Sequence, residues 1–454
     1  FGFEPHVIDG HDPLAIREAF RTHAAAADSK SRPVAIIANT VKAWGFQDVL
    51  GSEVHGKAVS ESDLPKALAL LEAKRAQLNA KWSKDEVARP EPIRVEVKRA
   101  PSAPPPASLT EAVETLGKQD MLTGGALAPR KAFGIALEVL NRANPMIVAL
   151  DGDVGNSTYS DLFREDEAMA GRFFECRIAE QNMISCAVGL ASEGKIPFAA
   201  TFAKFLSRAY DQLEMALVSG AHLKLVGSHV GASVGADGPS QMGLSDVAFF
   251  RAFTSARDKS GRPLMHVLNP SDGYGAYRLT LAMAAYEGAC YLRTVRSDVP
   301  LLYDDRTLFE LGGHHLLYAG EDVLLVATGY TVHEVVKAVR ALWKEGVNPT
   351  VVDLYSIPFD GKAIADLAVA NHGRVLTVED NYACGFGAAV ADALAAHARG
   401  LQSVSLFARR IPKSGRTSDD VLDYLGLSAS HIAAAALRLA SKEFQSIAAS
   451  NTAT

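Results

Sequence analysis

The chain has 454 residues, of which 48% are hydrophobic and 22% are charged, and its formal net charge at pH 7 is −6. The length corresponds to about three domains on a prior of ~150 residues each, and the composition is ordinary for a globular protein. The negative charge and the lack of any Lys/Arg run argue against a nucleic-acid partner. No apolar stretch reaches the ~18 residues of a membrane span, which argues against a membrane partner.

The first 120 residues contain two compositionally different stretches. Residues 1–85 alternate short strand-like runs, at 6–9 and 34–38, with polar helices. A Pro-rich linker is predicted over 86–120, because six prolines fall between residues 86 and 108. Such a segment should be extended rather than packed.

Two α/β regions follow, over 121–310 and 311–454. The first has a predicted helix at 130–140 with one apolar face, and a continuously apolar strand at 146–150 that is typical of a buried parallel sheet. The second has predicted strands at 323–327, 350–353 and 375–378, with an amphipathic helix after the first of them. The repeated strand–helix–strand order predicts an α/β fold of successive doubly wound parallel sheets.

The spacing and surroundings of the four cysteines indicate the cellular compartment of the protein. None forms a Cys-x-x-Cys pair, and most lie among apolar residues: Cys176, Cys186, Cys290 and Cys384. This usage predicts reduced, buried thiols and a cytoplasmic protein. No HExxH, EF-hand or clustered Cys/His motif appears, so the sequence supports no metal site within these residues.

Three segments contain the polar residues that most suggest chemistry: Leu150-Asp-Gly-Asp-Val-Gly-Asn-Ser157, Arg177-Ile-Ala-Glu-Gln-Asn-Met183 and Gly235-Ala-Asp-Gly-Pro-Ser-Gln241. The second segment puts Glu180 at the start of an apolar helix, one turn before Met183 and on the same inward face. One interpretation is a first-turn carboxylate stabilised by the helix dipole, worth a few tenths to about one kcal/mol. The other is a buried acid that keeps its proton for chemistry at neutral pH.

These segments, in this order, resemble the pyrimidine-binding domain of transketolases, which are thiamine-diphosphate enzymes, and most closely the animal-like form. The resemblance covers nearly the whole chain. It implies the C-terminal part of a diphosphate-binding domain at 1–85, a pyrimidine-binding domain at 121–310 and a transketolase C-terminal domain at 311–454. It also implies a homodimer with active sites at the subunit interface, which transfers a two-carbon ketol unit between phosphorylated sugars in the pentose phosphate pathway.

The resemblance implies a set of coenzyme contacts. Glu180 would hold N1′ of the aminopyrimidine ring, while Phe202 and Phe205 would stack on the ring and surround it. Without the resemblance, these two phenylalanines would be read as core aromatics. Gln241 would make a polar contact near the coenzyme, where a His would indicate the yeast-like or bacterial form. Asp153 and Lys42 complete the expected coenzyme contacts.

A second implied set binds the substrate. Arg130, Ser157 and Arg296 would hold the sugar phosphate, which two guanidinium groups and a hydroxyl suit well. His229 and Asp237 would contact the ketose hydroxyls, and His55 would reach the reacting carbonyl as a second catalytic residue. The residues alone leave other interpretations open: Arg296 as a surface charge and His229 as a core polar group.

Two departures from the family pattern concern the diphosphate. The family's Lys-Gly-(Arg/Lys)-Gly is replaced by Lys42-Ala-Trp-Gly45, which lacks the first glycine and the second basic residue. This difference weakens the expected assignment of Lys42 more than that of His55. The family also binds the diphosphate through Mg²⁺ or Ca²⁺, using a Gly-Asp-Gly sequence and a later Asn that are not found here. We therefore expect that most of the diphosphate-binding domain precedes Phe1, and that the chain is truncated and incomplete by itself.

Two other functions stay open at this point. One is a related thiamine-diphosphate enzyme, such as deoxyxylulose-phosphate synthase or dihydroxyacetone synthase, against which Ser157, His229 and Gln241 argue. The other is a non-catalytic interaction subunit with this fold, which the absent metal motif favours and Glu180 opposes. No chemistry is assigned to the C-terminal domain, where Glu379 and Asp380 are expected to be capping or solvated groups.

Overall fold

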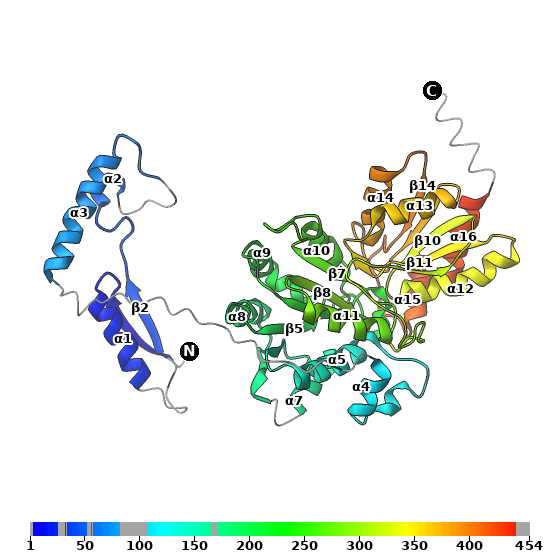
Figure 1. The fold of residues 1–454 in the computed structure, drawn as a ribbon, viewed down its shortest axis with the longest axis horizontal. Coiled ribbons are helices and arrows are strands. Elements are labelled where there is room, and N and C mark those ends of the chain that lie inside the picture. The colour runs from blue at the N-terminus through cyan, green and yellow to red at the C-terminus, as the bar shows by residue number, and fades with distance from the viewer. Residues whose placement is uncertain are drawn as a thin grey trace. The chain divides into compact units, whose positions relative to one another are not determined.

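The computed structural model describes residues 3–25, 32, 34–51, 56, 58–81, 105, 108–165 and 170–441. The chain divides into two compact units, Phe1–Glu96 and Val97–Thr454 (Figure 1). In the part of the chain that is described, no helix is both long enough and apolar enough to cross a membrane.

The first unit has two parallel strands, β1 (Glu4–Asp9) and β2 (Val34–Asn39), so both predicted strands are confirmed. Its helices are α1 (Pro13–Ala25), α2 (Gln47–Leu50) and α3 (Leu64–Lys81). The Trp44 ring stacks on His11 with 4.5 Å between centroids, and Lys74 Nζ lies 4.7 Å from the same ring. These contacts join the turn after β2 to α3.

The first sheet of the second unit has seven strands in the order β12-β7-β8-β6-β5-β3-β4. All neighbours are parallel except β12, which pairs antiparallel with β7. Their bounds are β3 (Ile147–Asp151), β4 (Phe173–Glu175), β5 (Ile196–Phe202), β6 (Lys224–Ser228), β7 (Met265–Leu268), β8 (Ala289–Thr294) and β12 (Ser356–Ile357).

Helices cover both faces of this sheet, as the alternation of its side chains requires. On one face, Ala149 of β3 packs in a cluster with α5 (Pro129–Ala143) and α11 (Gly273–Ala285). On the other, Val148 and Leu150 pack with α8 (Glu180–Ser192), α9 (Tyr210–Val218) and α10 (Asp246–Thr254). The short elements are α6 (Gly155–Thr158), α7 (Leu162–Glu165), η2 (Ala170–Arg172), η3 (Phe205–Ala209) and η4 (Ala232–Asp237).

The second sheet has five strands in the order β14-β13-β10-β11-β9, with only β9 antiparallel. Its strands are β9 (His315–Tyr318), β10 (Val323–Ala327), β11 (Pro349–Asp353), β13 (Arg374–Val378) and β14 (Gln402–Leu406). Helices α12 (Thr331–Lys344) and α16 (Ala429–Ala440) pack on one face, and α13 (Gly361–Ala370) and α14 (Phe386–His397) on the other. Helix α15 (Ser418–Leu425) packs against η4. The prediction of doubly wound, mainly parallel sheets is confirmed.

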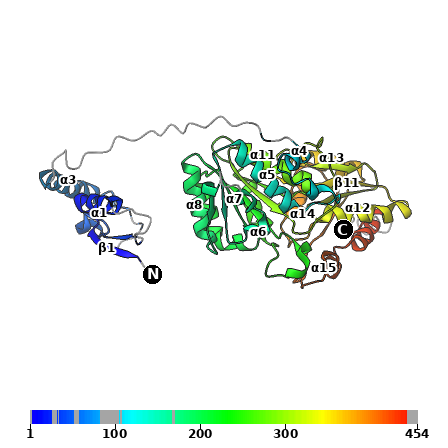
Figure 2. The same ribbon diagram turned by 90° about the horizontal axis from the view of Figure 1, so that it is seen from below.

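The predicted linker ends earlier than residue 120. Helix α4 (Leu109–Thr115) begins after Ser108, whose hydroxyl accepts a hydrogen bond from the Glu111 N–H, and η1 (Gln119–Leu122) follows. Leu109, Ala112 and Val113 are buried. Helix α4 lies beside α5 and α11 (Figures 1 and 2). The linker prediction was based on proline content alone. It overlooked Ser108 and Glu111, which form the Ser-x-x-Glu pattern typical of a helix start.

The cysteine prediction is partly wrong. All four cysteines are free, but Cys186 and Cys384 are exposed and only Cys290 is fully buried. Burial raises the pKa of the Cys290 thiol to about 12. Cys186 has apolar neighbours in the sequence, but the buried face of α8 centres on Met183, Ile184 and Ala187.

Candidate active site

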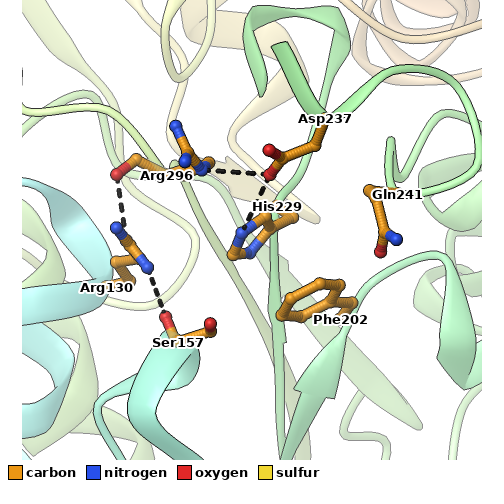
Figure 3. Close-up of a pocket in the computed structure, with 7 residues that line it drawn as sticks. All are labelled: Arg130, Ser157, Phe202, His229, Asp237, Gln241 and Arg296. Atoms are coloured by element: carbon orange, nitrogen blue, oxygen red, sulfur yellow. Dashed lines mark hydrogen bonds and ion pairs between the residues drawn. The ribbon is translucent and has the colours of Figure 1, made fainter. Parts of the chain in front are cut away.

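Seven side chains line a cavity of about 580 Å³ beside the seven-stranded sheet (Figure 3): Arg130, Ser157, Phe202, His229, Asp237, Gln241 and Arg296. Phe202 ends β5, His229 follows β6 and Arg296 follows β8. The carboxyl ends of parallel strands meet at one edge, which explains why residues far apart in sequence converge here. All seven were candidate site residues in the sequence analysis.

Arg130 is anchored by backbone carbonyls rather than by a carboxylate. It follows Pro129 at the start of α5; Nε donates to the Arg296 carbonyl at 2.9 Å and Nη1 donates to the Ser157 carbonyl at 2.7 Å. Burial, more than any nearby charge, lowers the pKa of Arg130. An arginine remains protonated at physiological pH, so this cavity wall carries a positive charge.

The Asp237 carboxylate lies between the guanidinium group of Arg296 and the imidazole ring of His229. Its Oδ2 lies 3.0 Å from Arg296 Nε and 3.6 Å from His229 Nε2, and all three side chains point toward one another in Figure 3. Ser228 Oγ lies 2.8 Å from His229 Nδ1 on the other side of the ring. If the Ser228 hydroxyl donates to Nδ1, the neutral ring presents an Nε2–H donor to the cavity.

His229 is neutral at physiological pH. Its side chain is 3% exposed, and burial, followed by the charges of Arg130 and Arg296, lowers its pKa to about 3. Its backbone has φ of +57°, which is uncommon for a residue other than glycine. The position therefore holds a hydrogen-bonding imidazole rather than a third cation.

An aromatic stack forms part of the cavity. The Phe202 ring stacks on His229 with 3.8 Å between centroids, and on Phe205 with 5.0 Å between centroids. Phe205 begins η3 just beyond β5 and does not itself line the cavity. Nearby, Gln241 Oε1 is buried and has no hydrogen-bond partner among the described residues. The stack provides a flat apolar surface next to an available acceptor.

Glu180 is a buried carboxylate with one unused oxygen. It is the first residue of α8 and its exposed fraction is 0%. Oε1 pairs with Arg208, whereas the buried Oε2 finds no hydrogen-bond donor in the described part of the chain. A buried polar atom without a partner costs about 1–3 kcal/mol, which a ligand donor would recover. Glu180 is thus a first-turn acid of α8 that is also buried and keeps one acceptor oxygen without a partner among the described residues.

Sequence reasoning missed Arg208 and Ser228. Arg208 lies in η3, 28 residues after Glu180, and its side chain is half-exposed. No spacing rule pairs these two residues, because they meet only through the packing of α8 against η3. Ser228 is the last residue of β6, and its place directly before His229 was the available signal.

Three further residues were expected to contact the coenzyme or the substrate. Asp153, with φ of +66°, lines a separate cavity of about 330 Å³, and its Oδ1 is 3.7 Å from Arg177 Nη1. Lys42 is exposed in the first unit, within the turn that follows β2. His55 falls outside the described residues. Of the described residues, no group of three or more His, Cys, Asp or Glu side chains is suited to hold a metal ion.

Comparisons with known proteins agree with this fold. Residues 125–300 match the family "Transketolase, pyrimidine binding domain" and residues 312–432 match "Transketolase, C-terminal domain". Transketolase-like protein 1 of Bos taurus is 35% identical over 448 residues, which cover 97% of this chain and 70% of the relative. Human transketolase is 36% identical, with coverage of 97% and 66%. The chain thus spans about two thirds of the length of these relatives.

Solved structures give the same assignment. A split-gene transketolase, described as an inactive β4 tetramer, is 31% identical with a TM-score of 0.60; the match covers 69% of this chain and 98% of that one. Transketolase from Leishmania mexicana, 18% identical with a TM-score of 0.63, shares the fold over 97% of this chain and 66% of its own. Together with the sequence relatives, these matches establish that the chain belongs to the transketolase family.

Proposed function

We propose that this protein is a transketolase, which uses thiamine diphosphate to transfer a two-carbon ketol unit from a ketose phosphate to an aldose phosphate. The observation that carries the proposal is the cavity, where two guanidinium groups, a neutral imidazole, a carboxylate and a hydroxyl-bearing residue converge. This set of donors and acceptors suits a phosphorylated, polyhydroxylated substrate. The reaction belongs to the pentose phosphate pathway, and the free cysteines support a cytoplasmic location.

The phosphate would bind between Arg130, Arg296 and Ser157. Charge-assisted hydrogen bonds from guanidinium groups to a phosphate are roughly twice as strong as hydrogen bonds between neutral groups. Asp237 already neutralises part of the Arg296 charge, at 3.0 Å, and would contact sugar hydroxyls together with His229. Because His229 is neutral, it can donate to a hydroxyl oxygen without attracting a second anion.

The described residues fit the aminopyrimidine ring of the coenzyme. Glu180 Oε2 and Gln241 Oε1 are buried acceptors that have no partner among the described residues, and Phe202 and Phe205 form a stack suited to a flat ring. Glu180 would hold ring nitrogen N1′ and keep a proton there, while Gln241 would contact the ring's polar edge. When bound, thiamine diphosphate supplies the carbon nucleophile that carries the ketol unit. Asp153, Lys42 and His55 remain proposed contacts.

The described residues do not fit a metal ion, so no step is assigned to one here. We propose that the Mg²⁺ or Ca²⁺ and the diphosphate are held by protein residues outside the described part of this chain. The solved split-gene relative supports this division, because its chain, which matches 69% of this one, is described as an inactive β4 tetramer. The complete enzyme is proposed to be a homodimer with active sites at the subunit interface.

The proposal is tested by Glu180→Gln in the complete protein, assayed with thiamine diphosphate and Mg²⁺. The amide keeps nearly the same volume but cannot supply a proton to N1′, so ketol transfer should fall by about 10²–10⁴-fold, the usual contribution of one acid–base group. Thermal unfolding should change little, since Gln retains an oxygen for Arg208. Wild-type turnover in this variant would remove Glu180 from the role, and a wild-type protein unable to transfer ketol units would refute the proposal itself.

A further inference from the structure

Three of the seven cavity residues lie on one irregular segment. Residues 229–243, called the substrate loop from here on, contain His229, Asp237 and Gln241. The short helix η4 within this loop is broken at Gly235, where φ is +74° and ψ is −107°. Gly231 and Gly238 also have positive φ, of +74° and +77°. The two ends of the loop are joined by hydrogen bonds from the Gly231 N–H to the Gly243 carbonyl and from the Gly243 N–H to the His229 carbonyl. The irregular residues between these ends depend more on outside contacts to keep one conformation.

Asp380, which follows β13 in the C-terminal domain, contacts the start of this loop. Its Oδ2 accepts a hydrogen bond from the Ser233 N–H at 3.2 Å, and its carbonyl accepts one from the Ala232 N–H at 2.8 Å. The carboxylate also lies against Gly231, so closely that a Cβ built there would overlap it. Asp380 is 2% exposed, so the expectation of a solvated group is wrong for this residue, whereas its contacts with the N–H groups that begin η4 are of the capping kind. For Glu379 the capping expectation is confirmed, because its carboxylate accepts from the N–H groups that begin α14.

Arg293, in β8, contacts the end of the same loop. It is fully buried, with Nε 2.8 Å from Asp246 Oδ2, and its Nη2 donates to the Gly243 carbonyl at 3.3 Å. Its Nη1 donates to Asn381 Oδ1 at 3.4 Å, and Asn381 is the neighbour of Asp380 in sequence. Burial raises the pKa of Asp380, and the charge of Arg293 opposes that rise. The two ends of the substrate loop are thus held by one buried polar network.

A second segment of the C-terminal domain contacts the middle of the loop. Ser418 Oγ donates to the Ser233 carbonyl at 2.6 Å, and the Gly415 N–H donates to the Gly235 carbonyl at 3.3 Å. The loop is therefore bound to the C-terminal domain along much of its length. None of these C-terminal residues lines the cavity.

We propose that Asp380 is a positioning residue, through which the C-terminal domain holds the substrate loop in the conformation that binds the sugar phosphate. Asp380 touches neither substrate nor coenzyme; it acts through the backbone of residues 231–233, and so through the placement of His229 and Asp237. The proposal rests on the proposed function for its kinetic consequences, but the conformational consequence can be measured without any activity.

The test compares Asp380→Ala with Asp353→Ala. Asp353 is a matched control because its carboxylate is also buried at the end of a strand of the same sheet, but it bonds to Ser271 and Tyr303 and not to the substrate loop. In hydrogen exchange of the full chain, amides of residues 229–243 should exchange at least tenfold faster in Asp380→Ala and remain unchanged in Asp353→Ala. Amides of β5 should remain protected in both.

A second experiment measures the steady-state kinetics of the same variants in the complete enzyme. Asp380→Ala should raise KM for the ketose phosphate at least tenfold while kcat falls less than threefold, and Asp353→Ala should leave KM within twofold of wild type. Asp380→Asn keeps one acceptor oxygen, so its KM should rise less than that of Asp380→Ala. This variant also replaces Asp380→Ala in the test if the alanine variant does not fold. Unchanged exchange of the loop in Asp380→Ala, or equal KM changes in both alanine variants, would overturn the inference. If the wild type lacks ketol transfer, the proposed function fails and the exchange experiment alone decides the role of Asp380.

Discussion

The side chain of Arg130 holds two backbone carbonyls in place and can still bind a ligand. The carbonyls of Arg296 and Ser157 use Nε and Nη1, and so orient the planar guanidinium toward the cavity. No bond to Nη2 is found within the described residues, so this nitrogen remains able to donate to a ligand. A lysine could not replace this arrangement, because its single ammonium lacks the rigid fork of donors.

We expect Arg130→Ala to raise KM for phosphorylated sugars far more than for hydroxypyruvate, an unphosphorylated donor. Loss of one hydrogen bond to a charged group costs about 1.5–3 kcal/mol, which corresponds to roughly 10–150-fold in KM. Steady-state kinetics with both donors measures the difference, and Arg306→Ala, at an exposed arginine paired with Asp304, is the control. Equal losses with both donors would mean that Arg130 mainly holds the two carbonyls.

At the scale of elements, the junction between the two sheets contains an unusual carboxylate. Asp353 ends β11, and its Oδ2 accepts hydrogen bonds from Ser271 Oγ at 2.6 Å and from the Tyr303 hydroxyl at 2.8 Å. Its Oδ1 is buried with no partner in the described part of the chain. Burial raises the pKa of Asp353 to about 7, and the nearby Asp272 adds to the rise.

This raised pKa predicts a specific pH dependence of stability. Between about pH 4 and pH 7 the unfolded chain loses the Asp353 proton while the folded protein retains it, so the folded state is destabilised as pH rises. Asp353→Asn removes this titration; the free energy of unfolding of wild type relative to the variant should therefore fall from pH 4 to pH 7 and level off above it. Urea denaturation of both proteins at several pH values measures this, and a difference that does not vary with pH would contradict the assignment.

At the scale of the whole molecule, the boundary of the second unit decides which fragment is stable. The unit Val97–Thr454 includes α4, whose Leu109, Ala112 and Val113 are buried against α5 and α11. Removing this helix would expose apolar surface on both partners. A fragment that starts where the Pro-rich composition suggested, at residue 121, would lack α4.

We expect residues 97–454 to fold by themselves and to unfold at a higher temperature than residues 121–454. Full burial of a Leu or Val side chain contributes about 1.5–3 kcal/mol, so loss of Leu109 and Val113 with α4 should lower Tm by roughly 4–8 °C in a unit of this size. Differential scanning calorimetry of the two fragments provides the comparison. Identical Tm values would mean that α4 contributes nothing to the core that it contacts.

The sequence alone determined the parts of this protein that depend on local pattern. Apolar runs located the central strands of both sheets, as at 323–327, because a strand buried on both faces must be apolar throughout. The family resemblance located the seven cavity residues, most of which follow the carboxyl ends of parallel strands that meet at one edge.

Only the tertiary structure decided which distant groups meet. Arg208 pairs with Glu180 across 28 residues, and Asp380 bonds to Ser233 across 147. Such contacts depend on how whole helices and domains pack, and no periodicity or propensity encodes their partners. Burial is decided in the same way: Cys186 and Asp380 were both misjudged because exposure follows from the packed surroundings of a residue and not from its neighbours in sequence.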